Sequence, residues 1–236
     1  MSGCTRQKES KFPENMSGVE FMLLYPIMRL FRMLLPLCIA ASLVAADYRI
    51  KTVEVLPVES YPAHVAVDDI TIAADPYPND EKCFTAFDVS KLASRGYFPV
   101  NIIIKNSSSY YLKIKTRNIT LETRLGQRLY STPAAMVVEE VVGKKYGDSL
   151  STTISGDYAA EKIASPLSDF TGKELTNRLI DPGTVYSGFL FFFSEKTKRS
   201  IFIGSTLHIP NLEEEGTLKT HGPFTIPMDP ALNILK

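Results

Sequence analysis

The chain has 236 residues, 44% of them hydrophobic, with 26 Lys and Arg against 26 Asp and Glu. This balanced charge argues against an electrostatic nucleic-acid binder, which shows a basic excess or a basic stripe. The length permits one domain with a sizeable apolar core.

Residues 28–47, "MRLFRMLLPLCIAASLVAAD", form the first recognisable element. Arg29 and Arg32 give a positive start, residues 33–46 carry no charge, and small residues precede Asp47. This order is typical of a secretory signal peptide that is cut before Asp47. The apolar run is shorter than the about 20 residues of a membrane-spanning helix, so we favour cleavage over a retained anchor.

The predicted signal peptide is preceded by residues 1–27, so we expect translation to begin at Met28; the alternative is a long polar extension of the signal. We therefore separate an upstream extension and signal peptide at 1–46 from a single domain at 47–236. That domain carries 21 Lys and Arg against 23 Asp and Glu. Cys38 raises the alternative of a lipid anchor, but the large residue before it argues against a lipoprotein signal.

Export predicts a periplasmic or extracellular location, with membrane anchoring as the alternative if the signal is retained or lipidated. Cys83 is the one cysteine of the predicted domain, so no disulfide forms within that domain. We expect Cys83 to be a buried thiol that packs like a small hydrophobic side chain, rather than one that pairs with another chain.

The domain begins with two predicted strands, 48–56 and 69–76, and a short helix at 77–87 that Asn79 caps. Strict alternation of apolar and other side chains then predicts strands at three positions. These are 97–106, 110–116 and 118–125. Because short turns separate them, we expect an antiparallel meander with one solvent-facing side.

Helical patterns interrupt the strands in the middle of the domain. Residues 132–145 read as a helix with Pro133 at its first position, and 155–180 as one or two short helices broken near Pro166. We expect a helical insertion at about 132–180 that lies across the strands.

The last part of the domain returns to strands. In 181–193 a Pro-Gly turn opens a strand that is apolar on both faces from Val185 onward, which predicts a central strand or one beneath a helix, and 200–209 is expected to pair with it as a hairpin. A shorter strand at 222–229 carries prolines typical of an edge. About eight strands with turn signals between them favour a β-sandwich.

Three stretches together resemble a group of exported bacterial proteins of uncharacterised function. They are "ITIAADPYPNDEK" (70–82), "YFPVNIIIKNSS" (97–108) and "PGTVYSGFLFF" (182–192). The resemblance implies an immunoglobulin-like antiparallel β-sandwich, here with the helical insertion. Its motifs are core and turn residues, so it implies no catalytic, cofactor-binding or metal-binding residues.

Possible metal ligands are weakly patterned. His64, His208 and His221 are far apart in the sequence, so a zinc site is less expected than three separate histidines. Calcium is an alternative for the acidic residues between 68 and 81, but their spacing is not that of an EF-hand loop, and turn formation and capping explain them. These acidic residues are Asp68, Asp69, Asp75, Asp80 and Glu81. We therefore assign no metal and no cofactor.

Other polar and aromatic residues give equally general signals. No motif places a nucleophile, and Cys83 has no nearby histidine. Tyr110 and Tyr111 are candidates for a binding surface at the end of the sandwich. Asn106 and Asn118 match N-x-Ser/Thr, which matters only in a host that glycosylates them. The acidic stretch 212–216 is most simply a solvated loop.

The sequence thus predicts an exported, non-enzymatic module of the cell envelope that binds a protein or glycan component and no nucleic acid. One alternative is a hydrolase or metal-dependent enzyme, favoured if a pocket gathers His208 and His221 with carboxylates. Another is a structural subunit of an envelope complex, which predicts an exposed apolar patch on the helix at 132–145. That patch would comprise Val137, Val138, Val141 and Val142.

Overall fold

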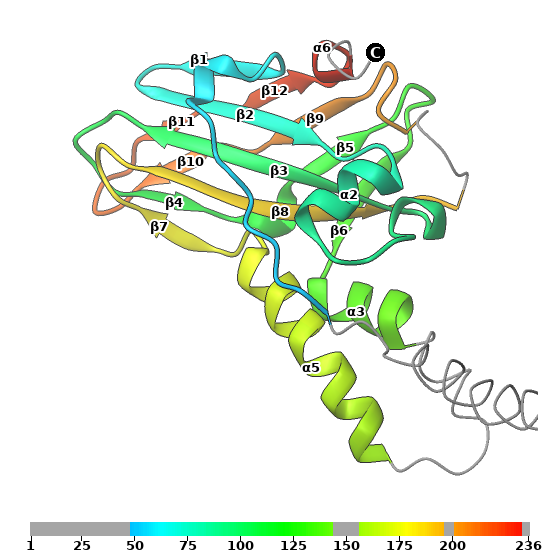
Figure 1. Ribbon diagram of the computed structural model, residues 1–236. Coiled ribbons are helices and arrows are strands. Elements are labelled where there is room, and N and C mark those ends of the chain that lie inside the picture. Colours follow the sequence, from blue (N-terminus) through cyan, green and yellow to red (C-terminus); the bar gives the residue numbers. More distant parts are fainter. Residues whose placement is uncertain (1–47, 144–155, 196–200, 233–236) are drawn as a thin grey trace, which may run out of the picture. The chain divides into compact units, whose positions relative to one another are not determined.

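The structure is a computed structural model that describes residues 48–143, 156–195 and 201–232 (Figure 1). The chain divides into two compact units, Met1–Asp47 and Tyr48–Lys236. The first unit lies outside the described residues, together with Met28 and Cys38. The signal peptide, the start site and the lipid anchor therefore stay predictions.

The described part is mainly β, with two antiparallel sheets, as the sequence predicts. The larger sheet has the order β1 (His64–Val67), β2 (Ile70–Pro76), β3 (Tyr97–Asn106), β8 (Val185–Phe193), β6 (Arg128–Thr132), β5 (Thr120–Glu122), β9 (Thr206–Ile209), β12 (Phe224–Pro227). The smaller sheet has the order β11 (Thr220–His221), β10 (Leu212–Glu214), β4 (Leu112–Ile114), β7 (Arg178–Ile180). The end strands β1 and β12 contact each other, so the larger sheet is nearly closed. The immunoglobulin-like arrangement itself is not confirmed and stays a prediction.

Short helices join these strands. They are η1 (Val58–Ser60), α2 (Asp80–Ala86), η2 (Ala93–Arg95), η3 (Thr116–Asn118), α3 (Ala134–Val138), the π-helical turn η4 (Glu139–Gly143), α5 (Gly156–Lys173) and α6 (Asp229–Leu232). Helix α2 begins as predicted, because the Asn79 side chain accepts a hydrogen bond of 2.8 Å from the Lys82 N–H. In Figure 1, α3 and α5 lie together beneath the sheet, and they contact each other.

Strand pairing differs from the predicted order. The meander is wrong, since β3 pairs with β2 and β8, β4 belongs to the smaller sheet, and β5 pairs with β6 and β9. The hairpin of 181–193 with 200–209 is also wrong, because β9 pairs with β5 and β12. Residues 48–56 form no strand; β1 takes the position beside β2 through the tight turn at Asp68 and Asp69. Pairing depends on long-range burial, which alternation within one segment does not encode.

The helical segments need two corrections. Helix α5 runs unbroken through Pro166, because one proline removes a single hydrogen bond while Phe170, beyond it, is anchored in the core. The end of the predicted 155–180 helix is strand β7 instead. The apolar patch predicted around Val137 and Val141 is also wrong: all four valines are buried, and α5 packs against α3 and η4.

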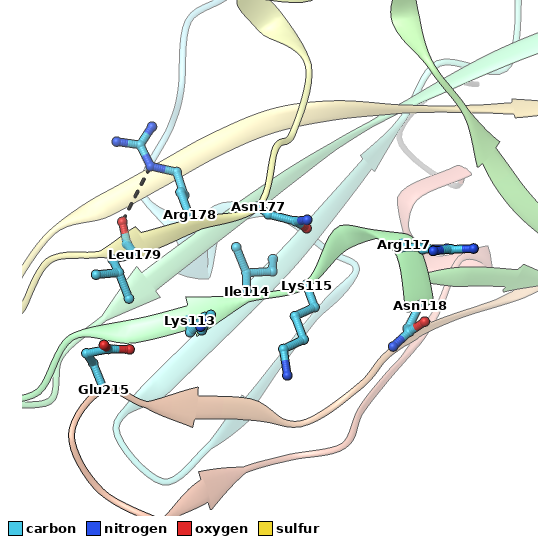
Figure 2. Close-up of a pocket in the computed structure, with 9 residues that line it drawn as sticks. All are labelled: Lys113, Ile114, Lys115, Arg117, Asn118, Asn177, Arg178, Leu179 and Glu215. Atoms are coloured by element: carbon cyan, nitrogen blue, oxygen red, sulfur yellow. Dashed lines mark hydrogen bonds between the residues drawn. The ribbon is translucent and has the colours of Figure 1, made fainter.

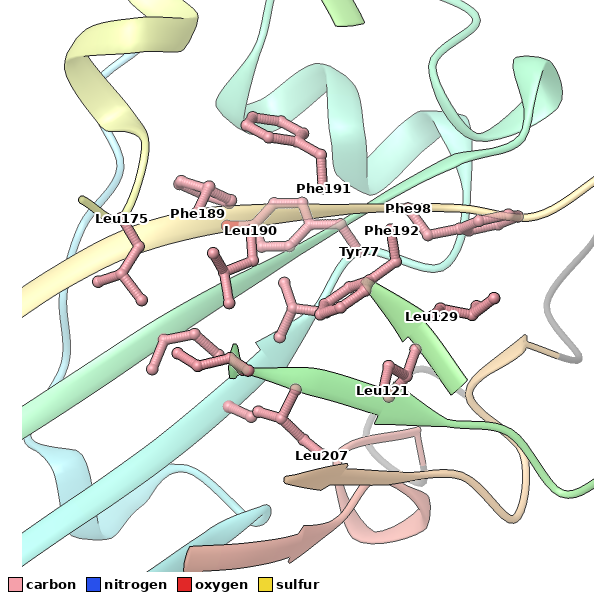
Figure 3. Packing of buried hydrophobic residues seen from close by; sticks show 14 of the residues in the cluster. Tyr77, Phe98, Leu121, Leu129, Leu175, Phe189, Leu190, Phe191, Phe192 and Leu207 are labelled. Atoms are coloured by element: carbon pink, nitrogen blue, oxygen red, sulfur yellow. The ribbon is translucent and has the colours of Figure 1, made fainter. Parts of the chain in front are cut away.

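Strand β8 supplies the core with aromatic rings on both of its faces (Figure 3). Phe189 and Phe191 face the helices, where their ring centroids lie 5.0 and 5.5 Å from that of Phe87. The Phe87 ring also lies 4.2 Å from that of Phe170 in α5. On the other face, Figure 3 shows Phe192 pointing toward the leucines of β5, β6 and β9. The predicted central strand beneath a helix is thereby confirmed.

Candidate functional site

A groove of about 460 Å³ lies along strands β4 and β7 of the smaller sheet (Figure 2). Its lining comes from β4, η3, β7 and the turn after β10. The lining residues are Lys113, Ile114, Lys115, Arg117, Asn118, Asn177, Arg178, Leu179 and Glu215. Four of these side chains are cationic and one is acidic, so we call this feature the basic groove.

Strand alternation places the two lysines in the groove. Leu112 and Ile114 of β4 are buried, whereas Lys113 and Lys115 are exposed on the opposite face. Side chains two residues apart in a strand lie on the same face, about 7 Å from each other. The apolar pair thus fixes β4 on the core and presents both ammonium groups to the solvent.

The other wall of the groove comes from the chain that follows α5. The Leu175 N–H donates to the Phe189 carbonyl oxygen of β8 over 2.9 Å. Gly188 makes this crossing possible, because a Cβ atom at that position would lie 2.8 Å from the Leu175 Cα. This anchor delivers Asn177 and Arg178 to the edge of β4.

The cations of the groove differ in what they contact. The Lys115 Nζ lies 2.5 Å from Glu213 Oε1, and this hydrogen bond lowers the pKa of the Glu213 carboxyl. The Arg178 guanidinium lies over the Tyr186 ring, 4.2 Å from its centroid. Within the described ranges, Lys113 and Arg117 form no ion pair. These two side chains are therefore available to an anionic ligand.

Asn177 contributes an oriented donor. Its Oδ1 accepts hydrogen bonds from the N–H and the hydroxyl of Thr116, over 2.7 and 3.0 Å. Because the oxygen is used on both sides, the Asn177 NH₂ group is the part left for a ligand. The groove thus presents N–H donors from lysine, arginine and amide side chains, which suits carboxylate or phosphate oxygens.

A buried ionic cluster lies on the inner face of the same sheet. The His221 ring is 2% exposed, and its Nδ1 and Nε2 lie 2.7 Å from Asp68 Oδ2 and 2.8 Å from Glu214 Oε1. Each ring nitrogen of His221 thus lies within hydrogen-bond distance of a carboxylate oxygen. Burial alone raises the pKa of the Glu214 carboxyl, but hydrogen bonds from His221, Thr217 and Lys219 outweigh burial and hold this pKa below its usual value.

The alternative site that would gather His208 and His221 with carboxylates is not assembled. His208 lies in β9, 3.6 Å from Glu122, whereas His221 lies in the other sheet with different carboxylates. His64 is exposed and contacts the Tyr61 carbonyl oxygen. In the part of the chain that the structure describes, no three His, Cys, Asp or Glu side chains form a group that could hold a metal ion.

The acidic residues considered for calcium also have separate partners. The Asp75 carboxylate lies 2.5 Å from Lys82 Nζ, and Asp80 accepts hydrogen bonds from the N–H and hydroxyl of Ser94. Asp68 adopts the left-handed backbone, with φ of 53°, in the β1–β2 turn. Turn formation, as expected from the sequence, accounts for this position.

Cys83 is fully buried in α2, as predicted, and burial raises the pKa of its thiol to about 12. The thiolate is the reactive form, so we expect iodoacetamide to label native Cys83 about 1,000-fold more slowly at pH 8 than in guanidinium. Mass spectrometry of the peptide that contains Cys83 measures both rates separately from the other cysteines. Equal rates would show that the native thiol is accessible.

The two glycosylation motifs differ in accessibility. Asn106 is fully buried, and its amide donates to the carbonyl oxygens of Tyr110, Ile180 and Asp181 over 2.8 to 3.2 Å. Asn106 therefore joins two loops and is closed to modification, whereas Asn118 is exposed in the basic groove.

Two surface predictions have different outcomes. Tyr110 and Tyr111 are half exposed in the loop that leads into β4. The stretch 212–216, predicted as a solvated loop, instead contains β10, whose Glu214 is buried against His221. The prediction is wrong because His221 replaces water as a hydrogen-bond partner of the Glu214 carboxylate, so this acidic residue can be buried.

Most residues of the basic groove were not candidates in the sequence. Alternation in 110–116 does predict that Lys113 and Lys115 share the polar face of a strand. No sequence signal brings Asn177 and Arg178 to them, because the two segments meet only through the β4–β7 pairing. The sequence signal at Asn118 is its glycosylation motif alone.

Among the described residues, no helix is both long and apolar enough to cross a membrane. No protein-family model and no curated protein matches the sequence.

Two solved structures from Bacillus subtilis are similar to this chain at low identity. One is a candidate lipoprotein, ycdA, at 14% identity and a TM-score of 0.37; the match covers 71% of this chain and spans 39% of ycdA. The other is the yjhA protein, at 9% identity and a TM-score of 0.32, with 62% of this chain and 78% of yjhA covered. At these TM-scores the similarity carries no argument about this chain.

Proposed function

We propose that the protein is an exported, non-enzymatic binding module of the cell envelope that holds an anionic ligand in the basic groove. One observation carries this proposal: the groove combines Lys113 and Arg117, which form no ion pair with the described residues, with the oriented amide of Asn177. Its volume of about 460 Å³ falls within the range of small-ligand sites. Export rests on the signal sequence at 28–47.

The proposal assigns no reaction to the groove. Its polar groups are donors and fixed charges, and neither a histidine nor a cysteine lines it. The histidine with two carboxylates, His221, is buried on the opposite face of the sheet and is occupied by its partners. We therefore favour binding over hydrolysis, and we keep the immunoglobulin-like architecture as part of the proposal.

The proposal predicts that charge reversal in the groove weakens binding of anionic polymers. We expect Lys113→Glu/Arg117→Glu to lower the affinity for polygalacturonate or polyphosphate about tenfold at low salt, because two attractive charges become repulsive. Isothermal titration calorimetry measures the affinities, with dextran as the neutral polymer.

Lys91→Glu is the matched control, since Lys91 is exposed and lies outside the groove. It makes the same change of charge per site and is expected to keep wild-type affinity. Equal losses in both variants, or equal binding of dextran, would overturn the proposal.

A further inference from the structure

An exposed face of the larger sheet begins two residues beyond Asn118 of the groove. The strand register places four side chains in one row across β6, β5, β9 and β12: Tyr130 opposite Thr120, Thr120 opposite His208, and His208 opposite Thr225. Neighbours in such a row are about 5 Å apart. All four are exposed or half-buried, and Tyr130 is 62% exposed. We call this row the Tyr130 face.

The Tyr130 face points to solvent because the alternate residues are anchored in the core. Leu121, Leu129 and Leu207 are buried and point inward in Figure 3. Successive strand residues face opposite sides, so the row is held outward by these leucines. Because Tyr130 is held on the surface in this way, its flat ring is accessible to a ligand without a change in the protein's conformation.

The basic groove and the Tyr130 face are adjacent. Asn118 of the groove lies two residues before Thr120, with the buried Ile119 between them. The same turn, η3, contacts β6, the strand that carries Tyr130. Asn118, the last residue of η3, is thus separated from Tyr130 by Ile119, Thr120 and one cross-strand step of about 5 Å.

The basic groove and the Tyr130 face offer different side chains to a ligand. The groove end offers cations and the amides of Asn118 and Asn177, which bind carboxylates and hydroxyls. The other end offers an aromatic ring between threonine and histidine side chains. A sugar ring fits there, because its C–H face packs on an aromatic ring while its hydroxyls bond to neighbouring polar groups. The Glu122 carboxylate beside this row is paired with Arg128 over 3.4 Å.

We propose that the ligand of the basic groove is an acidic polysaccharide, whose chain continues from the groove over a second subsite centred on Tyr130. This inference rests on the proposed anion-binding function. Carboxylate-bearing sugar units bind at Lys113 and Arg117, and further sugar rings stack on Tyr130. A polyphosphate chain has the charge but no ring for the second subsite.

Galacturonate oligomers of two and eight units test the two subsites. We expect the octamer to bind more tightly than the dimer, and Tyr130→Ala to lower octamer affinity about tenfold without changing dimer affinity. Tyr130→Phe keeps the ring and is expected to retain octamer binding. Lys113→Glu/Arg117→Glu is expected to weaken both oligomers. Calorimetry gives the affinities, and melting curves confirm that each variant is folded.

The outcomes separate this inference from the proposed function. If the charge variant loses binding while Tyr130→Ala binds the octamer as the wild type does, the second subsite is refuted and the groove stands. Polyphosphate binding as tightly as the octamer, with no effect of Tyr130→Ala on either polymer, refutes the glycan as ligand. If the charge variant binds both oligomers and polyphosphate normally, the proposed function itself fails.

Discussion

Replacing His221 with leucine is expected to lower the melting temperature by on the order of 10 °C. The His221 ring lies 2.8 Å from Glu214 and 2.7 Å from Asp68, and both His221 and Glu214 are almost fully buried. Removing the ring leaves the Glu214 carboxylate in the sheet interior without its closest charge partner. Differential scanning calorimetry at neutral pH measures the change.

Two further variants show whether an isolated buried charge or lost packing causes this loss of stability. Asp68→Asn keeps a residue that tolerates the left-handed backbone and keeps a hydrogen-bond acceptor at a half-exposed position, so we expect a small effect. His221→Leu/Glu214→Leu removes both buried charges and is expected to melt above His221→Leu alone. A double variant no more stable than the single one would show that lost packing, rather than the isolated charge, causes the effect.

Replacing Phe87 with alanine is expected to destabilise the domain by about 3–5 kcal/mol. Phe87 is fully buried, and its ring packs between Phe170 of α5 and two rings of β8. The deletion loses the transfer energy of the ring and leaves a cavity that three rigid aromatic neighbours cannot fill. Denaturant unfolding, followed by circular dichroism, measures the free energy of unfolding.

Phe84→Ala is the matched control for this prediction. It makes the same substitution three residues earlier, within α2, at a side chain that is 44% exposed with Lys51 over its ring. We expect a loss below about 1 kcal/mol, because little area leaves the core. Comparable losses for Phe84→Ala and Phe87→Ala would mean that the aromatic cluster does not hold the helices to the sheet.

The two faces of β10 connect stability with the proposed binding site. Glu213 points outward and holds Lys115 in the groove, whereas Glu214 points inward to His221. The buried cluster thus fixes the strand whose outer face orders one groove lysine. Loss of His221 is therefore expected to disturb the groove through the position of β10, without a direct contact to the ligand.

Local elements that depend on nearest neighbours can be predicted from the sequence. Alternation predicts β3 at its observed bounds and the C-terminal end of β8, and Asn79 marks the start of α2 through its side-chain cap. Burial of Cys83 followed from its character as a small hydrophobic residue. These features depend on interactions between residues that are close in the sequence, so the sequence of one segment is enough to predict them.

The contacts between segments that are distant in the sequence follow only from the tertiary structure. Asp68 and His221 are 153 residues apart, and their contact requires both sheets to be in place. The groove likewise needs Asn177 and Arg178 beside the end of β4, which follows from the pairing of β4 with β7. Many pairings satisfy the same alternation, and the choice among them depends on how the whole core is filled. The sequence therefore predicted strands and their polar faces, while packing selected the partners that make the site.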